Sequence, residues 1–548
     1  MIYNKNVERF FKTTSNFIFA RQKTIFSSAL LLSLMIVLAR FAGFFRYRIL
    51  AGYFDAASLD VFFASFRIPD LIFEVLITGA LTSSFIPIFI KYKANKEELS
   101  DNISSVINLI FILLLLFIFV AAIFMGKIIG ALTPGYGPVQ TRQIVQFSSI
   151  LLLGQLPFLV AGNFLTGLGQ ANKTFFLPAV APVVYNLAII VVTILFSKTL
   201  FLSAPIWGVV AGAILMFIIQ MPILWYSRFN YKLVLKKTKG LIEFIRLVIP
   251  RAFTVVVAQI DATIDLTLST LLGGGAYTAF YLAQHLQLLP VSVLGMAFGI
   301  ASLPYLTEIY QEKRLDEFKK IVTDSILNLF FLTIPAAVFF IFARTPLVRL
   351  FFGGEKFSWD ATVTTAVTLS YFSLSLPFHT VYYLLTRCFY SLMDSRTPFY
   401  VSVISILVNT VLSLIFVFYL HLPVWSLGIS FSVSIILNSV VLFYILSKKV
   451  SGFAMSFIVT ELTKMGLASG VAGVFSYFLM KLLDGLIFDT SFTINVFLLL
   501  ATTFAAFISI YLFIGWLIDV KEIYLLTRLM LKAQEFQKKF TELYTQHE

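Results

Sequence analysis

The chain has 548 residues, of which 59% are hydrophobic and only 12% are charged, and its mean hydropathy is +0.93. Soluble proteins carry roughly 25% charged residues, so the composition excludes that class and indicates an integral membrane protein. The single cysteine, Cys388, excludes an internal disulfide framework and a CxxC metal site. The net charge of +14 comes largely from loops and a basic N-terminal arm, which suits anionic membrane lipids. We expect no nucleic-acid partner.

Runs of about 20 apolar residues or more predict fourteen transmembrane helices in an all-α fold. The runs lack the period-2 alternation of membrane-spanning strands, and residues 1–23 do not resemble a cleavable signal sequence. The predicted spans lie near 25–50, 58–92, 103–130, 143–169, 176–197, 203–226, 241–271, 276–310, 318–344, 360–391, 396–419, 423–447, 455–483 and 490–518.

The distribution of Lys and Arg predicts how these spans are oriented. With the N-terminus in the cytoplasm, both termini and the even-numbered connections hold 22 Lys/Arg, whereas the odd-numbered connections hold 4. Positive residues concentrate on the cytoplasmic side of membrane proteins. We therefore expect both termini on the cytoplasmic side of the membrane.

Weak internal similarity recurs at an offset of about 220 residues and predicts two parallel six-helix lobes. For example, Ser105-Val-Ile-Asn-Leu matches Ser325-Ile-Leu-Asn-Leu. The predicted organisation is a basic cytoplasmic arm (1–24), an N-lobe (25–226), a basic cytoplasmic linker (227–240), a C-lobe (241–447), two additional helices (448–518) and an amphipathic cytoplasmic tail (519–548).

Fifteen of the 41 Lys/Arg residues lie within predicted spans. A charged side chain at the bilayer centre costs about 2.5–3.5 kcal/mol even on lenient scales, so it normally faces a cavity or a partner. We expect a cationic, water-accessible interior that takes an anionic cargo. Arg40 and Arg46 lie in the first span, and either Arg40 faces this interior or it forms an ion pair with Asp60.

The second span contains a charged cluster around a proline. Arg67 and Asp70 flank Pro69, and Glu74 follows. Proline removes a backbone hydrogen bond, so the sequence predicts a kink here. An arginine guanidinium suits a pyrophosphate because it forms paired hydrogen bonds.

In the seventh span, Asp261 and Asp265 are four residues apart on one helical face. Either a cation such as Na⁺ relieves their repulsion, or Asp265 pairs with Arg251. His285 and His379 are either part of the interior or simply hydrogen-bonded within the helices. No GxSxG, HExxH or Walker A pattern is present, so we expect a transporter and not an enzyme.

The chain resembles, over all fourteen predicted spans and most specifically in the first two, the MurJ/MviN family of the multidrug/oligosaccharidyl-lipid/polysaccharide exporter superfamily. The resemblance is carried by Ala39-Arg-Phe-Ala-Gly-Phe-Phe-Arg46, by Asp60-Val-Phe-Phe-Ala-Ser-Phe-Arg-Ile-Pro-Asp-Leu71 and by Gly79-Ala-Leu-Thr-Ser-Ser-Phe-Ile-Pro87. It implies a flippase that moves lipid II, the undecaprenyl-pyrophosphate-linked peptidoglycan precursor, to the outer leaflet by alternating access. Peptidoglycan synthesis and cell shape would depend on this step.

The resemblance also implies roles for individual residues. Arg40, Arg46, Asp60, Arg67, Glu74 and His285 become candidate substrate-binding residues. Asp265 matches a Na⁺-coordinating aspartate of some members, with Asp394 and Thr410 as further candidate ligands; no other cofactor is expected. The chain departs from the family where Phe73-Glu74 and His285 replace arginines, which makes the interior less cationic.

Other functions fit the sequence less well. A flippase for another polyprenyl-pyrophosphate oligosaccharide, such as an O-antigen or capsule unit, is the main alternative. A multidrug cation antiporter would need an acidic interior, and a membrane glycosyltransferase would need a large outside loop. A scaffolding role would leave the buried arginines without a purpose. The oligomeric state is open.

Overall fold

A computed structural model describes residues 25–78, 85–227 and 229–523. Over these ranges the chain forms helices joined by short connections and has no strand, which confirms the all-α class. Two predictions concern residues outside these ranges. They are the basic arm 1–24 and nearly all of the amphipathic tail 519–548.

Internal contacts divide the chain into two compact units. The first unit comprises Met1–Thr278 and Phe351–Ala361, and the second comprises Ala279–Leu350 and Thr362–Glu548. The seventh predicted span therefore packs with the first unit, although the sequence repeat places it in the C-lobe. The repeat-based lobes remain a prediction.

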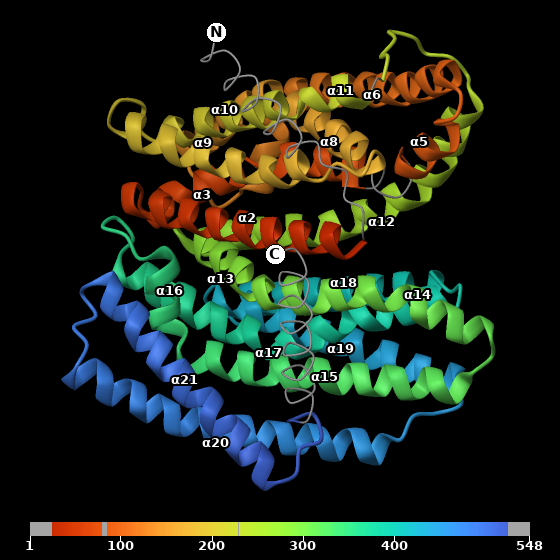
Figure 1. The fold of residues 1–548 in the computed structure, drawn as a ribbon. Coiled ribbons are helices and arrows are strands. Elements are labelled where there is room, and N and C mark those ends of the chain that lie inside the picture. Colours follow the sequence, from red (N-terminus) through yellow and green to blue (C-terminus); the bar gives the residue numbers. More distant parts are fainter. Residues whose placement is uncertain (1–24, 79–84, 228, 524–548) are drawn as a thin grey trace, which may run out of the picture. The chain divides into compact units, whose positions relative to one another are not determined.

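The described residues of the first unit form a series of α-helical and π-helical segments before its last long helix (Figure 1). They are α2 (Ile25–Tyr53), α3 (Ala56–Ala64), α4 (Arg67–Phe73), η1 (Glu74–Thr78), α5 (Ile86–Tyr92), α6 (Lys96–Leu132), α7 (Pro138–Ile150), η3 (Leu151–Gln155), α8 (Leu156–Ala171), α9 (Phe176–Leu200), α10 (Ser203–Gln220) and α11 (Pro222–Ser227), followed by α12 (Lys239–Thr270).

The remaining helices belong mainly to the second unit. They are α13 (Ala276–Pro290), η4 (Val291–Met296), α14 (Ala297–Gln311), α15 (Leu315–Phe342), α16 (Arg344–Phe352), α17 (Trp359–Ser391), α18 (Arg396–Leu414), η5 (Ile415–Tyr419), α19 (Trp425–Lys449), α20 (Met455–Leu486) and α21 (Thr493–Leu517). Within this unit α20 packs against both α15 and α21.

Ten helices of the described part are long and apolar enough to cross a membrane. The other four predicted spans correspond to α2, to the broken run from α3 to α5, to α12 and to α17. These four carry Arg46, Asp60, Asp265 and His379, so charged and polar side chains are concentrated in them. The chain is a multi-span membrane protein, and the exact count of fourteen stays a prediction.

Close helix packing in the first unit depends on glycines. On α10, Gly208 and Gly212 are four residues apart and face α9. A Cβ atom at Gly212 would lie 2.8 Å from the carbonyl oxygen of Tyr185, and one at Gly208 would lie 3.0 Å from the Cα of Ile189. Small residues at this spacing allow two membrane helices to approach closely.

The helix break in the second span has a clear cause in Pro69. The helix is interrupted between α3 and α4 at Ser65 and Phe66. In a continuous helix the carbonyl of Ser65 would accept from residue 69, but proline has no N–H. The Ser148 hydroxyl of α7 instead donates to this carbonyl at 2.9 Å. The predicted kink is confirmed, and a neighbouring helix satisfies the backbone group that the proline leaves.

Backbone geometry repeats along the chain with the offset found in the sequence. Lys173 and Met393, 220 positions apart, have φ angles of 61° and 59° in the turns after α8 and α17. The next residues, Thr174 and Asp394, donate to the carbonyls of Gly169 and Phe389 in the same pattern. The π-helical turns η1 and η4 begin 217 positions apart. This local geometry supports the predicted internal repeat.

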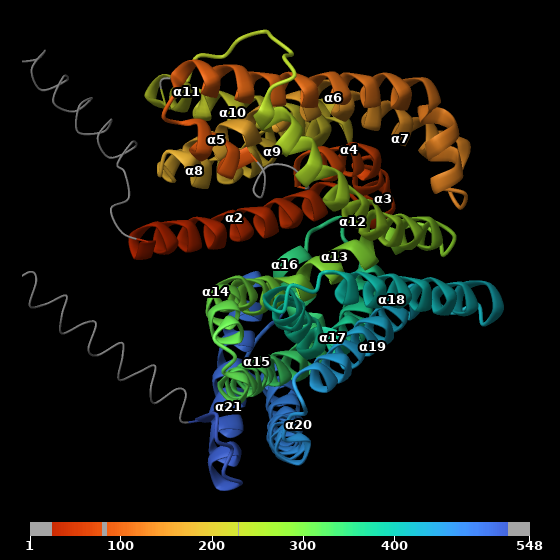
Figure 2. The same cartoon turned by 90° about the vertical axis from the view of Figure 1, so that its right-hand side faces the viewer.

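Polar side chains of α6 hold the connection that precedes α12. The Asn108 amide donates to the carbonyls of Lys232 and Val234 at 3.0 and 2.8 Å. Asp101 pairs with Lys232 at 2.8 Å and with Lys236 at 2.5 Å. Figure 2 shows this connection passing over α6. The predicted basic linker is therefore bound to the first unit along its described length.

Candidate functional site: the charged cluster of the first unit

Arg67, at the start of α4, is 9% exposed and is bound to α12. Its Nε donates to the Thr263 hydroxyl at 2.9 Å, and one Nη donates to the backbone and side-chain oxygens of Gln259 at 2.6 and 2.7 Å. The helix break at Pro69 places Arg67 in the first turn of α4, where it reaches the facing helix. Arg67 therefore joins two helices, and most of its donors are used within the protein.

Charged side chains of both signs surround Arg67. Asp70, Asp265 and Glu74 all interact with it electrostatically. Asp70 in turn interacts with Arg67, Glu74 and Arg46. Three carboxylates thus accompany two arginines in this cluster. Acidic residues of α4, η1 and α12 therefore lie among the arginines of this cluster, and the cationic interior stays a prediction.

The two predicted substrate-binding arginines of α2 have different surroundings. Arg46 is half-buried, and its guanidinium lies 4.6 Å from the ring centroid of Tyr47. Arg40 lies six residues earlier and is exposed. Arg40 forms no ion pair within the described part of the chain. Of the three predicted substrate-binding arginines, Arg40 is therefore the most accessible.

Asp60 does not pair with Arg40, which corrects one of the two readings of the sequence. Its side chain is completely buried on α3. Its two carboxylate oxygens accept from the backbone N–H groups of Gly275 and Thr278, at 2.6 and 2.7 Å. These donors belong to the beginning of α13, where backbone N–H groups have no partner within the helix. Asp60 thus caps α13 from another helix.

A glycine permits this capping contact. Gly275 has a φ angle of +86°, which L-residues with side chains rarely adopt. A Cβ atom there would also lie 3.0 Å from the Cβ of Ala56. The Thr278 hydroxyl completes the junction by donating to the carbonyl of Ala56 at 2.9 Å.

The two predicted histidines lie in the second unit and have local partners. The His285 ring stacks on Tyr281 of the same helix with centroids 4.0 Å apart, and its Nδ1 lies 2.8 Å from the Tyr281 carbonyl oxygen. His379 is buried, with Gln287 at 3.4 Å and a stacked Tyr383. His285 is thus bound within its own helix, and His379 is bound to a residue of α13.

The predicted Na⁺ ligands do not form one site. Thr410 lies on α18, sixteen residues beyond Asp394, which is about 24 Å at 1.5 Å per residue. Asp394 accepts hydrogen bonds from Thr397 and pairs with Lys449. Asp265 lies 2% exposed on α12. The described residues contain no cluster of three His, Cys, Asp or Glu suited to a metal. Asp394 and Thr410 therefore do not share one site, and Na⁺ binding by Asp265 stays a prediction.

Partial burial alone would raise the pKa of Asp394, which lies in the connection between α17 and α18. The hydrogen bonds from Lys449 and Thr397 outweigh this effect and lower the pKa to about 2. The carboxylate therefore acts as a structural anion. It holds the start of α18 and the end of α19 together.

Comparison with known proteins identifies the family. The chain is 26% identical over 429 residues to a "Probable lipid II flippase MurJ" of Buchnera aphidicola subsp. Acyrthosiphon pisum, covering 76% of this chain and 82% of the relative. It is 26% identical over 441 residues to a "Lipid II flippase MurJ" of Burkholderia cenocepacia, covering 78% and 84%.

The fold agrees with solved structures. A "Lipid II flippase MurJ, inward closed conformation" matches with a TM-score of 0.73 at 24% identity, covering 89% of this chain and 98% of that one. An inward-facing multidrug resistance MATE family transporter of the MOP superfamily matches with a TM-score of 0.64 at 14% identity, covering 77% and 98%. The family model described as "Lipid II flippase MurJ" matches residues 50–518. The chain therefore belongs to the MurJ family.

Proposed function

We propose that this chain is a lipid II flippase that moves the lipid-linked peptidoglycan precursor from the cytoplasmic to the outer leaflet of a bacterial inner membrane. The match of the MurJ family model to residues 50–518 carries the proposal. Curated relatives of similar length bear the name lipid II flippase. The alternative of another polyprenyl-linked glycan has no comparable support.

We further propose that both termini lie in the cytoplasm and that the two lobes alternate in opening to each side. The distribution of 22 against 4 Lys/Arg supports the orientation. The internal repeat supports the two-lobe mechanism, because parallel repeats suit rocking about a central site. Because no ATP-binding motif is present, ions or the membrane potential would supply the energy.

Within this mechanism, Arg40 and Arg46 would bind the pyrophosphate. Both lie on α2, and Arg40 is exposed. A guanidinium binds phosphate oxygens through paired, charge-assisted hydrogen bonds. Arg67 would instead hold α4 against α12, since its donors already bind Gln259 and Thr263. Asp60 would hold the start of α13.

The proposal can be tested with purified protein in proteoliposomes that contain lipid II. Translocation is measured as lipid II that becomes accessible to an externally added enzyme. We expect activity for the wild type, and loss of about tenfold or more for Arg40→Ala and for Arg46→Ala. The matched control is Arg396→Ala, which removes an exposed arginine at the start of α18. Wild-type protein that is correctly folded but inactive towards lipid II would contradict the proposal.

A further inference from the structure

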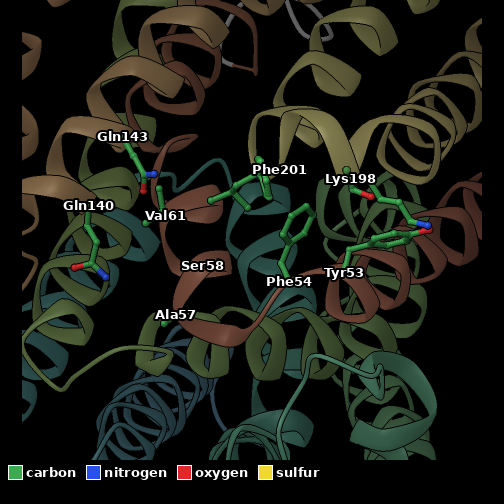
Figure 3. A pocket seen from close by; sticks show the side chains of 11 residues that line it. Tyr53, Phe54, Ala57, Ser58, Val61, Gln140, Gln143, Lys198 and Phe201 are labelled. Carbon is green, nitrogen blue, oxygen red and sulfur yellow. The ribbon is translucent and has the colours of Figure 1, made fainter.

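A pocket of about 510 Å³ opens in the first unit, away from the charged cluster (Figure 3). Its lining residues come from the α2–α3 connection and α3, the start of α7, and the α9–α10 connection. The volume lies within the ~300–1,000 Å³ typical of small-molecule sites. The loop-charge pattern puts all three of these connections on the outer side of the membrane.

Hydrogen-bond donors line the pocket at two opposite ends. Gln140 and Gln143 line it from α7, and Lys198 lines it from the end of α9 (Figure 3). The Gln140 carbonyl oxygen accepts from the backbone of Gly137 at 3.2 Å, so its amide NH₂ can serve a ligand. Lys198 is exposed and forms no ion pair within the described ranges.

The buried hydroxyl of Ser197 lacks a hydrogen-bond partner in the described part of the chain. Ser197 lines the pocket and is 6% exposed, yet its Oγ has no hydrogen-bond partner among the described residues. Buried polar groups in native proteins are nearly always paired with protein, water or ligand. Ser197 therefore supplies an independent sign that something polar binds here.

Aromatic rings form the rest of the pocket. Tyr53 and Phe54 line it with ring centroids 6.4 Å apart, and Phe201 joins them from the α9–α10 connection (Figure 3). Phe201 is 73% exposed and has a φ angle of 49°. His421, 220 positions later, shares this φ angle, so the backbone conformation belongs to the repeat. The two copies of the repeat differ in the side chain at this position, and only the first copy carries the large phenyl ring of Phe201.

The charge of the pocket is positive. None of its described lining residues is acidic. The nearest acidic residue in sequence, Asp55, is used locally, since it accepts from the backbone and hydroxyl of Ser58 at 3.3 and 2.6 Å. An acidic sugar is bound by groups of three kinds, and the pocket has all three. They are a cation without a counter-ion, amide and hydroxyl donors, and flat apolar rings. The rings pack on its C–H face, the amides bind hydroxyl and acetamido oxygens, and the lysine binds a carboxylate.

We propose that this pocket binds the glycan–peptide headgroup of the cargo, an N-acetylated sugar carrying carboxylates, on the outer side of the membrane. This inference rests on the proposed function. It gives the released headgroup a binding place that is separate from the arginines of α2. Retention there would keep the headgroup from returning while the lobes reset.

Binding can be measured in nanodiscs with a soluble N-acetylglucosaminyl–N-acetylmuramyl pentapeptide that lacks the polyprenyl diphosphate. We expect saturable binding to the full chain by calorimetry. Lys198→Ala and Phe201→Leu should each weaken it by about tenfold. The matched control, Lys356→Ala, removes an exposed lysine of the same unit that does not line the pocket and should leave binding unchanged. Since Lys198 and Phe201 are exposed, neither variant should impair folding, and thermal unfolding checks this.

Two competition experiments distinguish the sources of the ligand. Lipid II incorporated into the same nanodiscs should displace the soluble probe; failure to do so would overturn the assignment to the cargo. Nanodiscs rich in anionic phospholipid should not displace it; full displacement would mean that the pocket binds lipid headgroups. Equal binding by wild type and Lys198→Ala would also overturn the inference. If the chain translocates lipid II but does not bind the probe, only the assignment of this pocket is refuted. If the probe binds in a Lys198-dependent way but lipid II is not translocated, only the proposed function is refuted.

Discussion

The carboxylate of Asp60 on α3 accepts a hydrogen bond from the backbone N–H of Thr278, 218 residues further along the chain. The same side chain also accepts from Gly275. An acidic residue inside a membrane protein is usually assigned to cargo or ions. Here its oxygens are occupied by the first turn of another helix, so its principal role is structural.

This role predicts different outcomes for two substitutions. Asp60→Ala leaves two buried N–H groups without an acceptor, and each such group costs about 1–3 kcal/mol. Asp60→Asn keeps an acceptor oxygen and should recover part of the lost thermal stability and transport. Unfolding temperatures in detergent, measured together with translocation, check this. If Asn and Ala abolish transport equally while both proteins remain as stable as wild type, the charge of Asp60 acts on the cargo instead.

Arg67 should be coupled to Gln259 energetically. Because the guanidinium binds both the backbone and side-chain oxygens of Gln259, a double-mutant cycle of Arg67→Ala and Gln259→Ala should give a coupling of about 1–3 kcal/mol. Arg67→Lys should not restore stability, because an ammonium lacks the planar fork. The cycle of Arg40→Ala with Gln259→Ala serves as the control and should be additive. Additivity in the Arg67 cycle would argue against the contact.

The Ser148 hydroxyl should matter because it satisfies the carbonyl that Pro69 leaves without a donor. We expect Ser148→Ala to lower the free energy of unfolding by about 1–2 kcal/mol. Ser149 is a matched control, since its hydroxyl donates only to the Val145 carbonyl of its own helix at 2.7 Å. Ser149→Ala should change stability little. Equal effects of the two substitutions would contradict the proposed cause of the helix break.

Close packing of α9 and α10 predicts that Gly212 tolerates no side chain. The added methyl group in Gly212→Ala would meet the Tyr185 carbonyl oxygen at 2.8 Å, so the helices must separate and stability should fall. In Gly126→Ala, on α6, a Cβ meets nothing within 4 Å, and the better helix propensity of alanine should stabilise the protein by up to about 1 kcal/mol. Thermal unfolding of both variants should therefore shift in opposite directions.

The contact of Asp394 with Lys449 and Thr397 predicts a dependence of stability on acid pH. The folded-state pKa is about 2, below the ordinary value of 3.8. The contribution is therefore complete above pH about 4 and is lost as the pH falls through about 2. Asp394→Asn should remove this part of the acid dependence and leave the rest. A pH profile of unfolding that is identical for wild type and Asp394→Asn would contradict this account.

Local features of the fold could be predicted from the sequence because their causes are local. Proline chemistry predicts the break near Pro69, and the predicted offset of about 220 residues agrees with the similar turns at Lys173 and Met393. Apolar run lengths predict the ten long helices. Each of these depends on residues within one helix or one turn.

The partners of the charged residues could not be predicted in the same way. Arg67 binds Gln259, 192 residues away, and Asp60 binds Gly275, 215 residues away. An aspartate that caps a distant helix has the same sequence signature as one that binds an ion or an arginine. Asp70 and Glu74 could be placed near Arg67 because they lie in the same predicted span, whereas the approach of Asp265 from α12 could not be predicted.

The most direct test of the account is complementation in a bacterium whose own lipid II flippase can be depleted. This chain is expressed as wild type, Arg40→Ala and Arg396→Ala, with equal amounts confirmed in the membrane. Growth with wild type and Arg396→Ala, but lysis with Arg40→Ala, is the predicted result. Lysis with the wild-type chain at normal membrane levels would contradict the assignment as a lipid II flippase.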